Sequence, residues 1–199
     1  MAHENGYPDL CGGEEVVGGV CDSFNRSHER TRAVFVNQWD WNRQFCGRRM
    51  PEDMTLADLR YGSDLEFGLS VYEPFGISQL EPLSAGALCV VSNVCGCVGF
   101  ARQAGGAEAF RENIIEADYL RLSDVDSVEQ FVEMTMAQRE EVERAEAARL
   151  ARIVADRLPR DEGEMRHRIE TGFALAQKMN WDRVVRELFL PSVESAASR

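Results

Sequence analysis

The sequence lacks the features that mark membrane, secreted and nucleic-acid-binding proteins. Its 199 residues contain no run of about 18 apolar residues, the length that a membrane-spanning helix needs. The polar, acidic N-terminus has no basic region followed by an apolar stretch, so it does not resemble a signal peptide. Basic residues number 22 against 34 acidic ones, and no basic stripe is present to neutralise phosphates. We therefore expect a cytoplasmic protein that binds neither membrane nor nucleic acid.

Clusters of metal-ligating residues are also missing. The three histidines, at positions 3, 28 and 167, are scattered along the chain. Among the six cysteines, Cys95 and Cys97 are separated by one residue. This spacing is shorter than the roughly two to four residues usual in zinc sites, and no second pair follows. Without a secretion signal, a chain of this length is not expected to be a disulfide scaffold. The sequence thus predicts neither a metal site nor a disulfide scaffold.

What the sequence does contain is an apolar fraction of 44%, enough for a real core. Helical patterns alternate with apolar, β-branched runs, and we expect helices at 14–30, 56–62 and 77–85. Thr55 is expected to cap the second of these, with Asp58 at its third position, and Gly86 to end the third. Four buried strands are predicted, at 32–38, 65–71, 88–92 and 114–118. Apolar strands separated by helices indicate parallel pairing in an open sheet covered on both faces.

The C-terminal part is predicted to be helical throughout. A long helical tract from Asp124 or Ser127 reaches about Leu158, Pro159 ends it, and two further helices follow, the second capped by Asn180. The expected fold class is α/β, a Rossmann-like open parallel sheet with a C-terminal helical tail. We expect a lead-in loop and helix at 1–31, a Rossmann-like domain at 32–123, and C-terminal helices at 124–199 that pack on the same domain.

Two glutamates eight residues apart, Glu73 and Glu81, lie where such a sheet would bind a ligand. Ligands of doubly wound sheets lie beyond the carboxyl ends of the strands, and the strand 65–71 ends just before Glu73. A helix starting at Ile77 would direct unpaired N–H groups toward a phosphate, and Gly76 would let that phosphate approach closely. Carboxylates accept hydrogen bonds from the hydroxyls of a ribose or a hexose. The spacing therefore suits a nucleoside-diphosphate sugar. The alternative is that Glu73 merely complements a helix dipole and Glu81 is a surface residue.

The stretch "YEPFGISQLEPLSAGALCVVS" resembles the E-x7-E signature of retaining GT-B glycosyltransferases. The wider run as far as "SNVCGCVGF" is most similar to the C-terminal domain of glycogen synthases of the animal and fungal type. By position, the resemblance implies that Glu73 is the catalytic-site glutamate against the donor sugar and that Glu81 binds the ribose. It further implies that the donor sugar and phosphates contact Phe75, Gly76, Ile77, Ser78 and Gly96. Cys95 replaces a Gly or Ser that is common in the family.

The family resemblance also implies substrates and partners. The donor would be UDP-glucose or ADP-glucose, the acceptor a glucan or another glycosyl hydroxyl, and neither a cofactor nor a metal would be needed. GT-B enzymes have two Rossmann-like halves, whereas this chain has room for one, and no Arg and Lys segment precedes 32–38. We therefore expect an N-terminal half as a partner in cis or in trans, and no turnover by the chain alone, whether it is a fragment, a split subunit or a relic. The alternative is a non-catalytic nucleotide-sugar-binding or interaction module with a relic motif.

Overall fold

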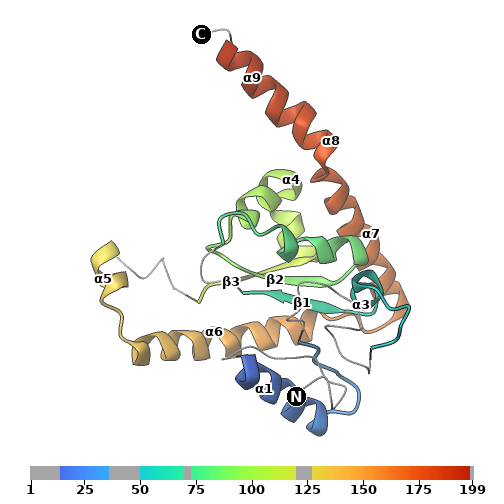
Figure 1. Ribbon diagram of the computed structural model, residues 1–199, viewed down its shortest axis with the longest axis vertical. Helices are drawn as coiled ribbons and strands as arrows, with labels where there is room; N and C mark the ends of the chain where they lie inside the picture. Colours follow the sequence, from blue (N-terminus) through green and yellow to red (C-terminus); the bar gives the residue numbers. More distant parts are fainter. Residues whose placement is uncertain (1–13, 36–49, 70–72, 120–126, 198–199) are drawn as a thin grey trace. The chain divides into compact units, whose positions relative to one another are not determined.

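A computed structural model describes residues 14–35, 50–69, 73–119 and 127–197 of the chain (Figure 1). The chain divides into two compact units, Met1–Leu59 and Arg60–Arg199. In the first unit, helix α1 (Glu14–Ser27) confirms the helix predicted from apolar spacing. Helix α3 (Leu56–Tyr61) spans the end of this unit, and Thr55 caps it as predicted. Thr55 Oγ1 accepts from the Asp58 amide at 3.3 Å, and the Asp58 carboxylate accepts from the Thr55 amide at 2.7 Å.

The strand predicted at 32–38 is wrong over its described part, because residues 32–35 form no strand. The physical reason lies in Asn25 at the end of α1. Its side-chain amide donates to the Ala33 carbonyl at 2.8 Å and accepts from the Ala33 amide at 2.7 Å. One side chain thus satisfies both backbone groups that a neighbouring strand would otherwise pair. Residues 36–38 of that prediction lie outside the described ranges.

The second unit is a mixed α/β structure built on a three-stranded parallel sheet. Its strands β1 (Leu65–Gly68), β2 (Leu88–Ser92) and β3 (Ile114–Ala117) are ordered β1-β2-β3 and pair in register. The predicted strands at 88–92 and 114–118 are confirmed, and the one at 65–71 is confirmed in its first half, since Leu69 lies beyond β1 and residues 70 and 71 are outside the described ranges. All five residues of β2 are buried, as expected for a central strand covered on both faces.

Helices cover the two faces of this sheet with separate apolar clusters (Figure 1). On one face, Cys89 and Val91 of β2 pack with residues of α4 (Gly96–Glu112) and α7 (Glu162–Lys178). On the other face, Leu88 and Val90 pack against Leu150 of α6 (Met136–Arg157). The alternation follows from the two-residue period of a strand. The remaining elements of this unit are η1 (Ile77–Gln79), η2 (Glu81–Ala85), α5 (Val128–Val132), α8 (Trp181–Val184), η4 (Val185–Phe189) and α9 (Leu190–Ala197).

Two helices predicted as continuous are interrupted. The helix at 77–85 is instead the pair of short 3₁₀ helices η1 and η2, although Gly86 ends it as predicted, with φ at 88°. Pro82 has no amide hydrogen to donate to the Ser78 carbonyl, so an α-helical ladder cannot pass it. The tract at 127–158 is divided before Thr135, which starts α6 with a capping box that includes Gln138. Asn180 caps α8 as predicted, accepting from the Arg183 amide at 2.9 Å.

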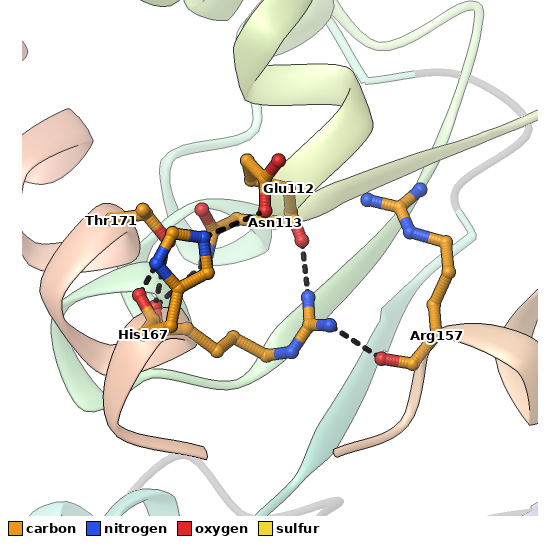
Figure 2. Close-up of polar contacts among 6 residues, drawn as sticks. Glu112, Asn113, Arg157, His167 and Thr171 are labelled. Carbon is orange, nitrogen blue, oxygen red and sulfur yellow. Dashed lines mark hydrogen bonds and ion pairs between the residues drawn. The ribbon is translucent and has the colours of Figure 1, made fainter. Parts of the chain in front are cut away.

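Arg168 of α7 joins the C-terminal ends of two other helices, at Glu112 and Arg157, which Figure 2 labels. Its guanidinium donates to the carbonyl of Glu112 at the end of α4, and to that of Arg157 at the end of α6 at 2.5 Å. In return its own carbonyl accepts from the fully buried Asn113 at 2.9 Å. A contact of 3.2 Å between His167 Nε2 and Glu112 lies beside this group. Burial lowers the pKa of the Arg157 and Arg168 guanidiniums. These charged hydrogen bonds fix α6 and α7 relative to the start of β3.

Within the described ranges, no helix combines the length and the apolar character needed to cross a bilayer. Over the same residues, no group of three or more His, Cys, Asp or Glu side chains is placed to hold a metal ion.

Candidate functional site

The loops that follow β1 and β2 meet at the carboxyl edge of the sheet. Glu73 and Cys95 form an isolated parallel bridge, and the Gly96 amide donates to the Glu73 carbonyl at 3.1 Å. Cys95 Sγ also contacts the Phe75 carbonyl at 3.3 Å, so the thiol can donate to it. The turn after β1 and the first turn of α4 are therefore held together by backbone and thiol contacts. Four of the residues that the sequence predicted for the donor site, Glu73, Phe75, Gly76 and Gly96, are brought together here.

Glycine is required on both sides of this junction. Gly76 has φ at 76° and ψ at 57°, in the left-handed region that residues with a Cβ seldom occupy. A Cβ there would overlap Cys95 Sγ and lie 2.6 Å from Gln79 Oε1. A Cβ at Gly96 would overlap the Pro74 carbonyl oxygen. Gly96 thus lets two backbone segments approach closely, and Gly76 leaves room for the side chains of Cys95 and Gln79.

The predicted phosphate-binding residues surround an exposed turn rather than the start of an α-helix. Gly76 precedes the three residues of η1, and the side chains of Phe75, Ile77 and Ser78 are exposed. The Phe75 ring packs on Phe100 of α4 with the ring centres 5.7 Å apart. Because η1 is a short 3₁₀ helix, its dipole is smaller than the one that an α-helix at 77–85 would supply. Gly76 itself is buried, with Cys95 Sγ and Gln79 filling the space at its Cβ position, so a phosphate could reach this turn only at the exposed residues Ile77 and Ser78.

Glu81 lies at the start of η2, and its carboxylate is held by a residue that the sequence did not single out. Arg60, in the last turn of α3, donates to Glu81 Oε2 at 2.6 Å. The same guanidinium lies 3.6 Å from the carboxylate of Glu66 in β1. Burial raises the pKa of Glu66, and the charge of Arg60 partly offsets this effect. The structure thus places Glu81 in a pair with Arg60 on the second unit, with about half of its side chain exposed.

A polar group at the ends of β2 and β3 was also not predicted. Asn93, directly after β2, donates to Asp118, directly after β3, at 2.8 Å. The Asp118 amide in turn donates to Glu146 of α6 at 2.8 Å, and Arg149 donates to that same carboxylate. The Asn93 side-chain oxygen is buried and has no hydrogen-bond partner among the residues that the structure describes. The sequence did contain a signal for this group. Asn93 and Asp118 each follow one of two adjacent parallel strands, and such positions lie at the same edge of the sheet.

Two open hollows on the described surface lie elsewhere. One follows the N-terminal half of α7 from Pro159 to Glu170, and the other lies along η4 and α9 from Glu187 to Ala196. Neither is lined by the residues of the E-x7-E segment.

No protein-family model matches the chain, and the comparison with curated proteins gives no match. The resemblance to retaining glycosyltransferases therefore depends on the motif residues alone.

Proposed function

We propose that the second unit binds a nucleoside-diphosphate sugar, as the Rossmann-like C-terminal half of a retaining GT-B glycosyltransferase similar to glycogen synthase. The observation that carries this proposal is the junction of the Glu73–Gly76 turn with the loop before α4, at the carboxyl edge of a parallel sheet. Open parallel sheets bind their ligands at this edge. The E-x7-E segment begins at the junction and ends at a carboxylate that a neighbouring arginine orients.

Each part of the donor has a proposed contact. The hexose lies against Glu73, and the diphosphate lies against the turn from Gly76 to Ser78, on the side where Ile77 and Ser78 are exposed. The ribose hydroxyls donate to Glu81. Arg60 engages Oε2 of this carboxylate, and a carboxylate has a second oxygen with lone pairs to accept from a diol. The donor phosphates act as the leaving group in a reaction that needs positive charge and backbone donors to stabilise them.

The remaining catalytic parts would come from a partner. We propose that an N-terminal half, in cis or in trans, supplies the acceptor site for a glucan or another glycosyl hydroxyl and cations for the diphosphate. The chain alone is then expected to bind the donor without transferring its sugar.

Nucleotide titration of the full chain tests the proposal. Calorimetry with UDP, ADP, UDP-glucose and ADP-glucose should detect binding of at least one of them. Glu81→Gln removes the charge of the ribose contact and keeps its shape. The hydrogen bond to a charged group, worth about 1.5–3 kcal/mol, is then replaced by one to a neutral amide oxygen, worth about 0.5–1.5 kcal/mol, so the affinity should fall roughly 5- to 13-fold. Glu108→Gln, on the exposed surface of α4, is the matched control and should bind like wild type.

Two results would count against the proposal. One is a folded wild-type chain that binds none of these nucleotides at millimolar concentration. The other is binding that Glu81→Gln leaves at the level of Glu108→Gln, because the ribose contact would then lie elsewhere.

A second candidate function, a non-catalytic interaction module, is favoured by the C-terminal helices. No residue of α8, η4 or α9 is buried, and large apolar side chains are exposed there, including Trp181 at 73% and Phe189 at 59%. Surfaces of this kind are typical of docking sites. Under this alternative, Trp181→Ala with Phe189→Ala would abolish association with a partner, and all four nucleotides would fail to bind.

A further inference from the structure

The start of α4 places two thiols in contact beneath the proposed donor turn. Cys95 and Cys97 flank Gly96, are 3% and 0% exposed, and have their sulfur atoms 3.0 Å apart. Both are free thiols. A disulfide bond is about 2.05 Å long, so the sulfurs need to close by roughly 1 Å. We propose that Cys95 and Cys97 form a reversible disulfide that switches the conformation of the Pro74–Gly76 turn.

The coupling to the turn follows from the contacts of Cys95. Its thiol lies 3.3 Å from the Phe75 carbonyl, and the space above Gly76 is filled by the same sulfur. Oxidation removes the S–H donor from the Phe75 carbonyl and draws the sulfur toward Cys97. The turn then loses a contact that fixes its backbone, at the residues where the proposed function places the diphosphate. The disulfide itself does not depend on that function, but its effect on nucleotide affinity does.

The chemistry is thiol–disulfide exchange with a small disulfide such as oxidised glutathione. The thiolate of one cysteine attacks the small disulfide, forming a mixed disulfide and releasing one thiolate, which takes up a proton. The second cysteine then attacks the protein sulfur of the mixed disulfide and releases the second small thiol. Two electrons pass from the two protein sulfurs to the small disulfide, and the two thiol protons end on the two released thiols.

The position of the pair predicts that the exchange is slow. Burial raises the pKa of Cys97, so this thiol stays protonated near neutral pH, and the thiolate is the reactive form. The sulfurs lie directly under exposed residues, because Gly96 between them and Phe75 above them are both exposed. Local opening of this turn is therefore sufficient to admit the small disulfide. The rate should rise about tenfold per pH unit below the thiol pKa, since the thiolate fraction does.

The experiment exposes the full chain to oxidised glutathione and counts the thiols that remain. After quenching, the chain is alkylated in denaturant, digested, and mapped by mass spectrometry on the peptide that carries Cys89, Cys95 and Cys97. The expected result is the loss of two alkylation sites, at Cys95 and Cys97, and their recovery with dithiothreitol. Cys89→Ser is the matched control, a buried cysteine of the same core cluster, and should leave this result unchanged. Cys97→Ser should instead stop at a single glutathione adduct on Cys95.

Three outcomes would overturn the proposal. They are full alkylation of both cysteines after the oxidant, glutathione adducts on both in the wild-type chain, and pairing of either one with another cysteine. Because the mapping uses the wild-type chain, it tests the disulfide even if Cys97→Ser does not fold. Titration of the two forms with whichever of UDP, ADP, UDP-glucose and ADP-glucose binds the reduced chain then tests the switch, with affinity at least about fivefold weaker after oxidation if a hydrogen bond of ordinary strength is lost. Equal affinities would refute the switch, whereas binding of none of the four nucleotides to either form would refute the proposed function and leave the disulfide result standing.

Discussion

Replacing Gly76 with alanine tests the geometry of the junction most directly. The residue has φ at 76°, and the left-handed conformation costs a residue with a Cβ about 1–2 kcal/mol. The added methyl group would also overlap Cys95 Sγ, and an overpacked site of this kind costs about 1–3 kcal/mol. Gly76→Ala should therefore lower the free energy of unfolding of the second unit by about 2–5 kcal/mol.

A double-mutant cycle separates the two contributions. In a Cys95→Ala background the overlapping sulfur is gone, and the end of the flexible Gln79 side chain can move aside. The cost of Gly76→Ala should then fall to the conformational part, about 1–2 kcal/mol. The resulting coupling of about 1–3 kcal/mol between the two substitutions is the direct signature of the contact.

Urea unfolding followed by circular dichroism supplies the measurement, with the slope of the transition checked for constancy between variants. Gly99→Ala is the control, because a Cβ at this position of α4 meets nothing within 4 Å. That control should be neutral or stabilising by up to about 1 kcal/mol. The reasoning is refuted if Gly76→Ala costs no more than Gly99→Ala, or if its cost is the same with and without the Cys95 sulfur.

Two further predictions concern stability. Arg168→Ala removes the guanidinium that donates to two helix-terminal carbonyls, and should lower the free energy of unfolding by about 1.5–3 kcal/mol. Arg166→Ala, on the exposed side of α7, is the control, and should change this free energy by less than about 0.5 kcal/mol in the same urea titration. Hydrogen bonds from Thr55 hold the pKa of Asp58 below its usual value. Its contribution to α3 is thus present above the unfolded-state pKa of about 3.9 and lost as the pH falls through the folded-state value. Amide exchange in α3, corrected for intrinsic rates, should increase in that acidic range, and Asp58→Asn should lack this pH dependence.

The sequence was sufficient for the strands that are buried on both faces. The run at 88–92 is apolar as far as Ser92, and its central position in the sheet leaves no solvent face that would impose alternation. The run at 114–118 contains Glu116, but Ile114, Ile115 and Ala117 around it are buried as expected. At 32–35 a similar run led to a wrong strand prediction. The side chain of Asn25, eight residues before Ala33, forms the backbone hydrogen bonds of Ala33 that a neighbouring strand would have formed. No periodicity in the run itself reports such a contact.

In the candidate site, too, features set by neighbouring residues could be predicted, whereas contacts between residues far apart in the sequence could not. The chain order of strand, turn and strand is enough to place the loops with Glu73 and Gly96 at one edge, since parallel strands end on the same side. The interruption at Pro82 was present in the sequence, and giving more weight to its missing amide would have predicted it. The pairing of Arg60 with Glu81 joins residues 21 positions apart, and spacing in the sequence carries no signal for it.

The Arg60 pair bears on whether Glu81 can bind a ribose at all. An ion pair with this much solvent exposure contributes about 0.2–1 kcal/mol, whereas hydrogen bonds from a diol to a charged carboxylate are worth about 1.5–3 kcal/mol each. Hydrogen bonds from the ribose would therefore contribute more free energy than the loss of the Arg60–Glu81 ion pair would cost. A ribose that binds the second carboxylate oxygen leaves the pair intact. Arg60 also restricts the rotamers of Glu81 before any ligand arrives, which reduces the entropy lost on binding. If Glu81 binds the ribose as proposed, the pair with Arg60 would preorganise its carboxylate for a neutral hydroxyl ligand rather than block it.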